Sequence, residues 1–190
     1  MKHLFACRPT IFAAAILATA AFAAAQTPAP KPPPKSPSVT ESATISGKSI
    51  SIAYASPGVK GREGKIFTKD GLISHDPHYP VWRAGANSAT TLHTDADLDI
   101  GGLAVPAGNY TLFVDISDPD NWMLIVNKKT GEWGLAYDGT QDLGKVKFPT
   151  SATPSLVENL KYTITDNGGG KGSITLAWED KSATVGFQVK

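Results

Sequence analysis

The feature that most constrains this chain is a period-two alternation of apolar and polar residues in several segments. Successive side chains of an extended strand point to opposite faces, so this period indicates strands buried on one face only. One-sided burial of this kind is typical of antiparallel sheets. The alternating apolar positions are Ile50, Ile52, Tyr54, Leu160, Tyr162, Ile164, Ile174, Leu176, Trp178, Val185, Phe187 and Val189.

Two central segments, 110–116 and 122–126, are apolar at nearly every position, which predicts central strands covered on both faces. Turn-forming residues separate the predicted strands at intervals of about 8 to 12 residues. The spacing predicts a single all-β domain, an antiparallel β-sandwich or jelly-roll-like fold. At most one short helical turn is expected, at residues 156–159.

The N-terminus has the order of a secretory signal peptide, with Lys2 and Arg8 ahead of an apolar run at 11–25 and small residues before Gln26. The run is shorter than the roughly 20 residues that span a membrane as a helix. We therefore expect cleavage near residue 25, export to a periplasmic or extracellular location, and no membrane span afterwards.

A proline-rich stretch follows at residues 26–38, and its composition favours an extended, semi-rigid spacer. The folded domain is accordingly predicted to cover residues 39–190. Cleavage would remove Cys7, so the mature chain would have neither a disulfide nor a thiol nucleophile.

The charge balance excludes one class of partner. The chain has 18 basic and 17 acidic residues, and loss of Lys2 and Arg8 leaves 16 minus 17, or −1. A nearly neutral domain lacks the basic patch of a nucleic-acid binder, so no nucleic-acid partner is expected. No phosphate-binding loop occurs either, and no cofactor is predicted.

Four segments carry a resemblance to a known family: 56–62, 81–90, 106–113 and 176–179. On these segments the sequence resembles the domain-of-unknown-function family 2911. The resemblance implies an exported, single-domain protein and supplies no mechanism. The chain departs from the family pattern in the residues before Trp82, and it has Ser88 where an acidic residue is common.

Candidate ligand-binding residues cluster in the irregular segment 56–87, where Arg62, Arg83 and Asn87 follow or flank glycines. The guanidinium group offers five donors in a fixed geometry that suits polar ligands. These residues predict a non-catalytic domain that binds a small polar or carbohydrate-like ligand, or a partner protein in the cell envelope.

Two aromatic residues, Trp133 and Tyr137, flank a glycine in a loop-like segment and are candidates for stacking on a sugar ring. A purely structural interpretation of the cluster around Arg83 and Asn87 stays open. In it Trp82 fills the core, Arg83 pairs with an acid such as Asp99 or Asp115, and Asn87 caps a turn.

An alternative function rests on His75 and His78, which surround a carboxylate, with His93 as a third imidazole. Three histidines could hold a divalent metal such as zinc, and the chain would then be a metal-assisted hydrolase. The competing interpretation is a solvated turn with histidines at its edges. No Gly-x-Ser-x-Gly nucleophile motif is present, and no catalytic residue is assigned.

Overall fold

The alternating segments form the strands that they predict. The computed structural model describes residues 35–190, so the predicted signal peptide and most of the predicted spacer lie outside the described residues. Two single-turn 3-10 helices, η1 (Ile73–His75) and η2 (Gly139–Gln141), interrupt the strands. The strands are β1 (Ser38–Ile45), β2 (Lys48–Ala55), β3 (Val81–Trp82), β4 (Thr90–Thr94), β5 (Leu98–Ile100), β6 (Leu103–Val105), β7 (Gly108–Asp115), β8 (Asn121–Asn127), β9 (Asp142–Gly168) and β10 (Lys171–Val189).

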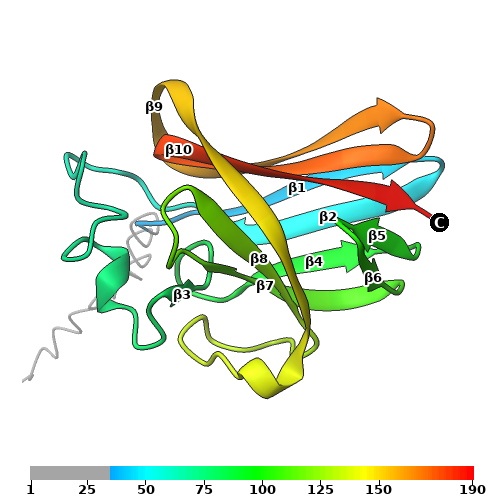
Figure 1. Cartoon of the computed structure of the whole chain (residues 1–190), viewed down its shortest axis with the longest axis horizontal. Helices are drawn as coiled ribbons and strands as arrows, with labels where there is room; N and C mark the ends of the chain where they lie inside the picture. Colours follow the sequence, from blue (N-terminus) through cyan, green and yellow to red (C-terminus); the bar gives the residue numbers. More distant parts are fainter. Residues whose placement is uncertain (1–34) are drawn as a thin grey trace, which may run out of the picture. The chain divides into compact units, whose positions relative to one another are not determined.

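All strand pairs are antiparallel and belong to one ten-stranded sheet. The order is β1-β2-β4-β7-β8-β9-β10-β5-β6, and the short β3 pairs with β7. The 27-residue β9 joins the two halves of the sheet (Figure 1), because residues 142–149 pair with β8 and residues 150–168 pair with β10.

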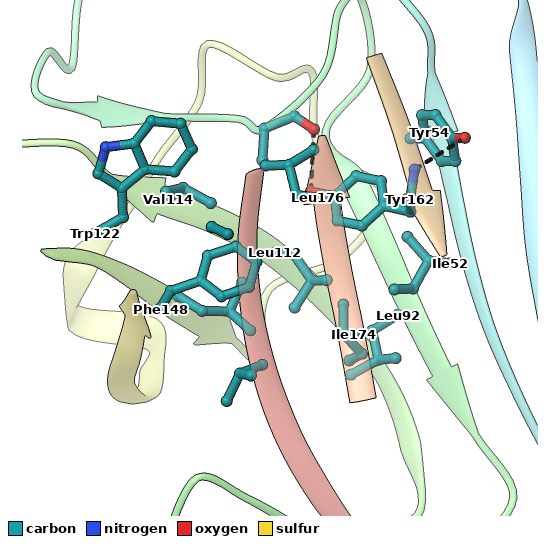
Figure 2. Packing of buried hydrophobic residues seen from close by; sticks show 14 of the residues in the cluster. Ile52, Tyr54, Leu92, Leu112, Val114, Trp122, Phe148, Tyr162, Ile174 and Leu176 are labelled. Carbon is teal, nitrogen blue, oxygen red and sulfur yellow. Dashed lines mark hydrogen bonds between the residues drawn. The ribbon is translucent and has the colours of Figure 1, made fainter. Parts of the chain in front are cut away.

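Both halves of the sheet contribute to one hydrophobic core. Leu92 and Leu112 come from one half and Ile174 and Leu176 from the other, and their side chains lie together in Figure 2. The sheet therefore curls back so that its halves enclose the same apolar interior. Removal of this apolar surface from water is the main stabilising contribution to such a fold.

The central strands β7 and β8 are buried on both faces, as predicted. One face joins the main core, and the other carries Phe113 and Ile125, which form a second cluster with Ala89. Val81 and Tyr137 pack against this second cluster from outside the two strands. The cover supplied by β3 and by the loop before β9 explains why these strands lack alternation.

Along one edge of β9, the backbone pairs only briefly, at the bridge between Gly58 and Asn159 with Leu160 N donating to Pro57 O (2.9 Å), and side chains make the hydrogen bonds beyond it. We call this contact the seam, and it joins residues 160–164 of β9 to β1, β2 and the residue after β2. The bonds are Ser56 Oγ donating to Leu160 O (2.6 Å), Tyr54 Oη accepting from Tyr162 N (3.2 Å, Figure 2) and Glu41 Oε1 accepting from Ile164 N (3.4 Å).

The prediction of an all-β antiparallel domain is confirmed. Because the strands are linked into one sheet, the finer sandwich or jelly-roll description stays a prediction. The helical turn expected at 156–159 is wrong, since these residues lie inside β9 and Val157 pairs with Glu179 of β10. The first strand begins at Ser38, one residue before the predicted domain boundary. Within residues 35–190 no helix has the length and apolarity to cross a membrane.

Candidate functional site

The irregular segment 56–87 forms most of the wall of a cavity of about 630 Å³. Arg62 and Arg83 both line it, together with Leu135 from the loop before β9 and Trp178 from β10. A cavity of this volume is in the range of small-molecule sites. The fold thus brings two of the predicted binding residues to one concave surface.

The wall of the cavity carries an excess of positive charge. Four basic side chains, those of Lys35, Lys60, Arg62 and Arg83, line it against the single carboxylate of Asp76. Like charges gathered in a concave surface raise the local potential and attract ligands of the opposite sign. The electrostatics of the cavity therefore favour an anion.

The two arginines differ in how their donors are used. Arg62 donates from Nε to Val59 O (2.9 Å) and from Nη2 to Gly58 O (2.7 Å), so it braces the turn that contains it. Arg83 has Nη1 at 3.6 Å from Asp76 Oδ2, which is an ion pair without a hydrogen bond. Its Nε and Nη1 are buried and have no hydrogen-bond partner among the described residues.

A third unpaired donor comes from the aromatic floor of the cavity. Trp82 and Trp178 stack with ring centroids 5.9 Å apart at an interplanar angle of 21°, and Phe67 packs edge-on against both. Trp178 is 2% exposed, and its Nε1 has no hydrogen-bond partner within residues 35–190. A buried donor without a partner costs about 1–3 kcal/mol. In the described part of the chain, three such donors belong to Arg83 and Trp178, two residues that line this cavity.

The loop that contains Gly134 passes directly over the Arg83 side chain. A Cβ on Gly134 would collide with Arg83 Cδ and lie 2.6 Å from Asn87 O. Gly134 N also donates to Asn87 O (3.2 Å). Asn87 is exposed, has a left-handed φ of 59° and does not line the cavity. Its place in the site is to hold the loop over Arg83.

The two aromatic candidates have different environments. Tyr137 donates to Asp142 Oδ2 (2.7 Å), and its ring packs against Phe113 at 4.8 Å. Burial, followed by the hydrogen bond to Asp142, raises the pKa of the Tyr137 phenol. Trp133 is 59% exposed and lies outside the cavity lining. Neither residue joins Arg62 and Arg83 in the cavity.

The three candidate metal-binding histidines are not brought together as a ligand set. His75 lines the cavity, and His78 Nε2 lies 3.0 Å from a backbone carbonyl oxygen. His93 is on β4, between Asn109 Oδ1 and Asp95 Oδ1 at 2.9 Å each. The bond to Asn109, then that to Asp95, raises the His93 pKa. In the part of the chain that the structure describes, no group of three or more His, Cys, Asp or Glu could hold a metal ion.

The structural interpretation of the arginine cluster is correct for Trp82, which is buried in the core. The partners expected for Arg83 are wrong. Asp99 pairs with Lys190 and Asp115 accepts from a nearby backbone N–H, while the acid beside Arg83 is Asp76. The acid comes from the turn after η1 because β3 places Arg83 next to that turn.

Several cavity residues escaped the sequence-based prediction. Lys60 lies in the same motif as Arg62, so its spacing was a usable signal. Trp178 was placed in the core by its strand pattern, and no sequence signal ties it to a segment about a hundred residues earlier. Gly134, which in the sequence stands out only as the neighbour of two aromatic residues, lies against Arg83 and outside the cavity lining.

Comparison with known families agrees with the resemblance seen in the motifs. Searches of curated proteins and of solved structures gave no match. One family model, described as a protein of unknown function (DUF2911), matches residues 36–187. This match includes all ten strands apart from the last residues of β10, and the chain belongs to the family DUF2911.

Proposed function

We propose that the domain is a non-catalytic binding module that holds a small anionic ligand in the cavity beside Arg83. The observation that supports the proposal is that, among residues 35–190, three buried donors on two cavity-lining side chains have no hydrogen bond: Arg83 Nε, Arg83 Nη1, which has only its ion pair with Asp76, and Trp178 Nε1. Buried polar groups in folded proteins almost always have partners. Acceptor oxygens from a ligand would supply them.

The kind of unpaired group favours an anion over a neutral carbohydrate. Sugar hydroxyls donate as well as accept, so a sugar site needs protein acceptors alongside donors. Here all three unpaired buried atoms are donors, in a wall where four basic side chains face one carboxylate. An ionised carboxylate only accepts hydrogen bonds and a phosphate mostly accepts them, so either anion matches both the hydrogen-bonding and the charge of the wall.

The proposed location is the cell envelope or the exterior, on the strength of the signal-like N-terminus. A ligand there would be a metabolite or envelope component rather than a cytoplasmic nucleotide. The nearly neutral charge of the domain, −1 after cleavage of residues 1–25, favours a compact binding site over an extended charged surface.

The test is a thermal-shift and calorimetric screen of the purified protein with acetate, succinate, phosphate and sulfate against glucose and glycerol. A ligand that binds only the folded state stabilises it by about 2.7 kcal/mol at a hundred times its Kd. We expect anions to raise the melting temperature in a concentration-dependent way and the neutral compounds to leave it unchanged.

The matched variants are Arg83→Met and Lys147→Met. Arg83→Met keeps an unbranched apolar side chain and removes the donors and the charge, so anion affinity should fall at least tenfold. Lys147 is an exposed basic residue on β9 outside the cavity, and its substitution should not change binding. Equal shifts with glucose and with anions, or full binding by a folded Arg83→Met protein, would overturn the proposal.

A further inference from the structure

We infer that the anion is a monocarboxylate that carries an apolar chain or ring. The carboxylate of this ligand would accept hydrogen bonds from Arg83 and Trp178. The apolar part would lie against Leu72 and Leu135 at the edge of the cavity. This inference rests on the anion-binding function proposed above and narrows its ligand class.

The apolar requirement comes from the side chains beside the donors. Leu72 and Leu135 line the cavity while 37% and 38% exposed, and both are among the few large hydrophobic residues of the described chain that stay exposed. Ile73 and Pro57 continue this apolar wall. A ligand that covers these side chains removes apolar surface from water, which a small inorganic anion cannot do.

The monoanionic head follows from the position of Asp76. Its side chain is 6% exposed, and Oδ2 lies 3.6 Å from Arg83 Nη1, so one carboxylate already faces the guanidinium. The planar carboxylate of a ligand can still accept hydrogen bonds from two N–H groups of the Arg83 guanidinium. A tetrahedral dianion would bring twice the negative charge towards Asp76, and like charges at such distances repel.

The donor set also excludes the uncharged analogue. Trp178 Nε1 and Arg83 are donors, and an amide head offers them one acceptor oxygen in place of the two of a carboxylate, while its NH2 group meets donors. Replacing the carboxylate of a ligand by an amide therefore separates recognition of the head from contact with the apolar part.

The experiment is calorimetry with the full protein and a homologous series of acetate, butyrate, hexanoate and octanoate, alongside inorganic phosphate and octanamide. Affinity should rise up to about fourfold for each added methylene group until the apolar wall is covered. Octanamide should bind at least tenfold more weakly than octanoate, and phosphate no more tightly than acetate.

Two leucine variants make the comparison specific. Leu135→Ser should flatten the dependence on chain length, so octanoate should lose more affinity than acetate. Leu156→Ser alters another exposed leucine, 49% exposed, which lies on β9 outside the cavity and should leave the whole series unchanged. Both substitutions are at exposed positions, and circular dichroism verifies that the variants fold.

The outcomes separate this inference from the function on which it rests. Anion binding that depends on Arg83 but not on chain length, or tightest binding of phosphate, overturns the inference and leaves anion binding in place. Absence of binding by every anion overturns both. A chain-length dependence that Leu135→Ser removes and Leu156→Ser retains supports both.

Discussion

Glu179 is a buried acid that follows Trp178 in β10 and anchors the loop at one side of the cavity. Its carboxylate accepts from the backbone N–H groups of Gly64 and Lys65. The residue has a left-handed φ of 56° at an irregular point in the pairing of β9 and β10. Burial, the largest cause, raises the Glu179 pKa above its usual range despite these hydrogen bonds.

This pKa gives a prediction about pH. The folded protein holds the Glu179 proton more tightly than the unfolded chain, so the stability linked to this group is present below about pH 4.3 and is lost as pH rises through the raised pKa. Glu179→Gln keeps an acceptor and removes the titration. Between the unfolded and the folded pKa of Glu179, the free energy of unfolding of the wild type should fall relative to that of the variant by up to about 1.4 kcal/mol per pH unit. Urea unfolding at a series of pH values measures this difference.

The control is Asp70→Asn, at an exposed position that makes no hydrogen bond with its side chain in the described chain. Its stability should follow the wild type across the same pH range. Wild-type and Glu179→Gln curves that stay parallel from pH 4 to 8 would show that the carboxyl titrates as it does in the unfolded chain.

At the residue scale, the sequence predicted the cavity only in part. Arg62 follows Gly61 and Arg83 lies two residues before Gly85 in an irregular segment, and that local pattern is enough to single them out. Trp178 reaches the cavity, and Gly134 reaches the side chain of Arg83, through tertiary packing from a remote strand and loop. Side chains that meet through long-range folding leave no local period or spacing to detect.

At the scale of elements, the seam depends on side chains that make hydrogen bonds where the short backbone pairing of Gly58 with Asn159 ends. Tyr54 Oη is the acceptor for the backbone N–H of Tyr162, and the two rings pack edge-on with centroids 5.0 Å apart. Burial raises the Tyr54 pKa, which agrees with a neutral phenol at this position. The hydroxyl thus completes the hydrogen bonding of a buried strand edge.

We expect Tyr54→Phe to reduce the free energy of unfolding by about 1–3 kcal/mol, because a buried N–H loses its acceptor. The matched control is Tyr110→Phe, whose hydroxyl donates to Pro106 O (2.9 Å). Pro106 is exposed, so water can replace that donor and the cost should stay below about 1 kcal/mol. Urea unfolding measures both; equal losses would contradict a special role for the seam.

Elements with clear alternation were predictable, and the middle of β9 was not. The segments 160–164 and 174–178 show period-two patterns that a single buried face imposes. Between residues 150 and 159 the strand is mostly exposed, and the apolar signal that would mark it is weak. A short helical turn was therefore expected where the pairing with β10 continues the strand. Tertiary pairing overrides such weak local preferences.

At the scale of the whole molecule, both halves of the sheet share one core and so should unfold together. Trp82, Trp122 and Trp178 are buried around Phe67, which makes tryptophan fluorescence a reporter of core packing. We expect the fluorescence and far-UV circular dichroism transitions in urea to coincide. Refolding should take milliseconds to seconds, as is typical of all-β folds with many long-range pairings.

A Trp133→Phe background removes the exposed tryptophan from the fluorescence signal and makes this comparison cleaner. Fluorescence that changes at lower urea than circular dichroism would indicate that the two halves of the sheet separate before the strands are lost. The shared core would then be weaker than its continuous packing implies.

The seam also affects how copies of the protein behave at high concentration. An unpaired strand edge is a template to which a second chain can add its own strand, the first step of intermolecular β aggregation. Along residues 160–164, backbone groups already make hydrogen bonds with Glu41, Tyr54 and Ser56. At the end of the sheet, the edge strand β6 is three residues long and so offers a second chain little to pair with. Substitutions that open the seam should therefore favour aggregation more than core substitutions of equal thermodynamic cost.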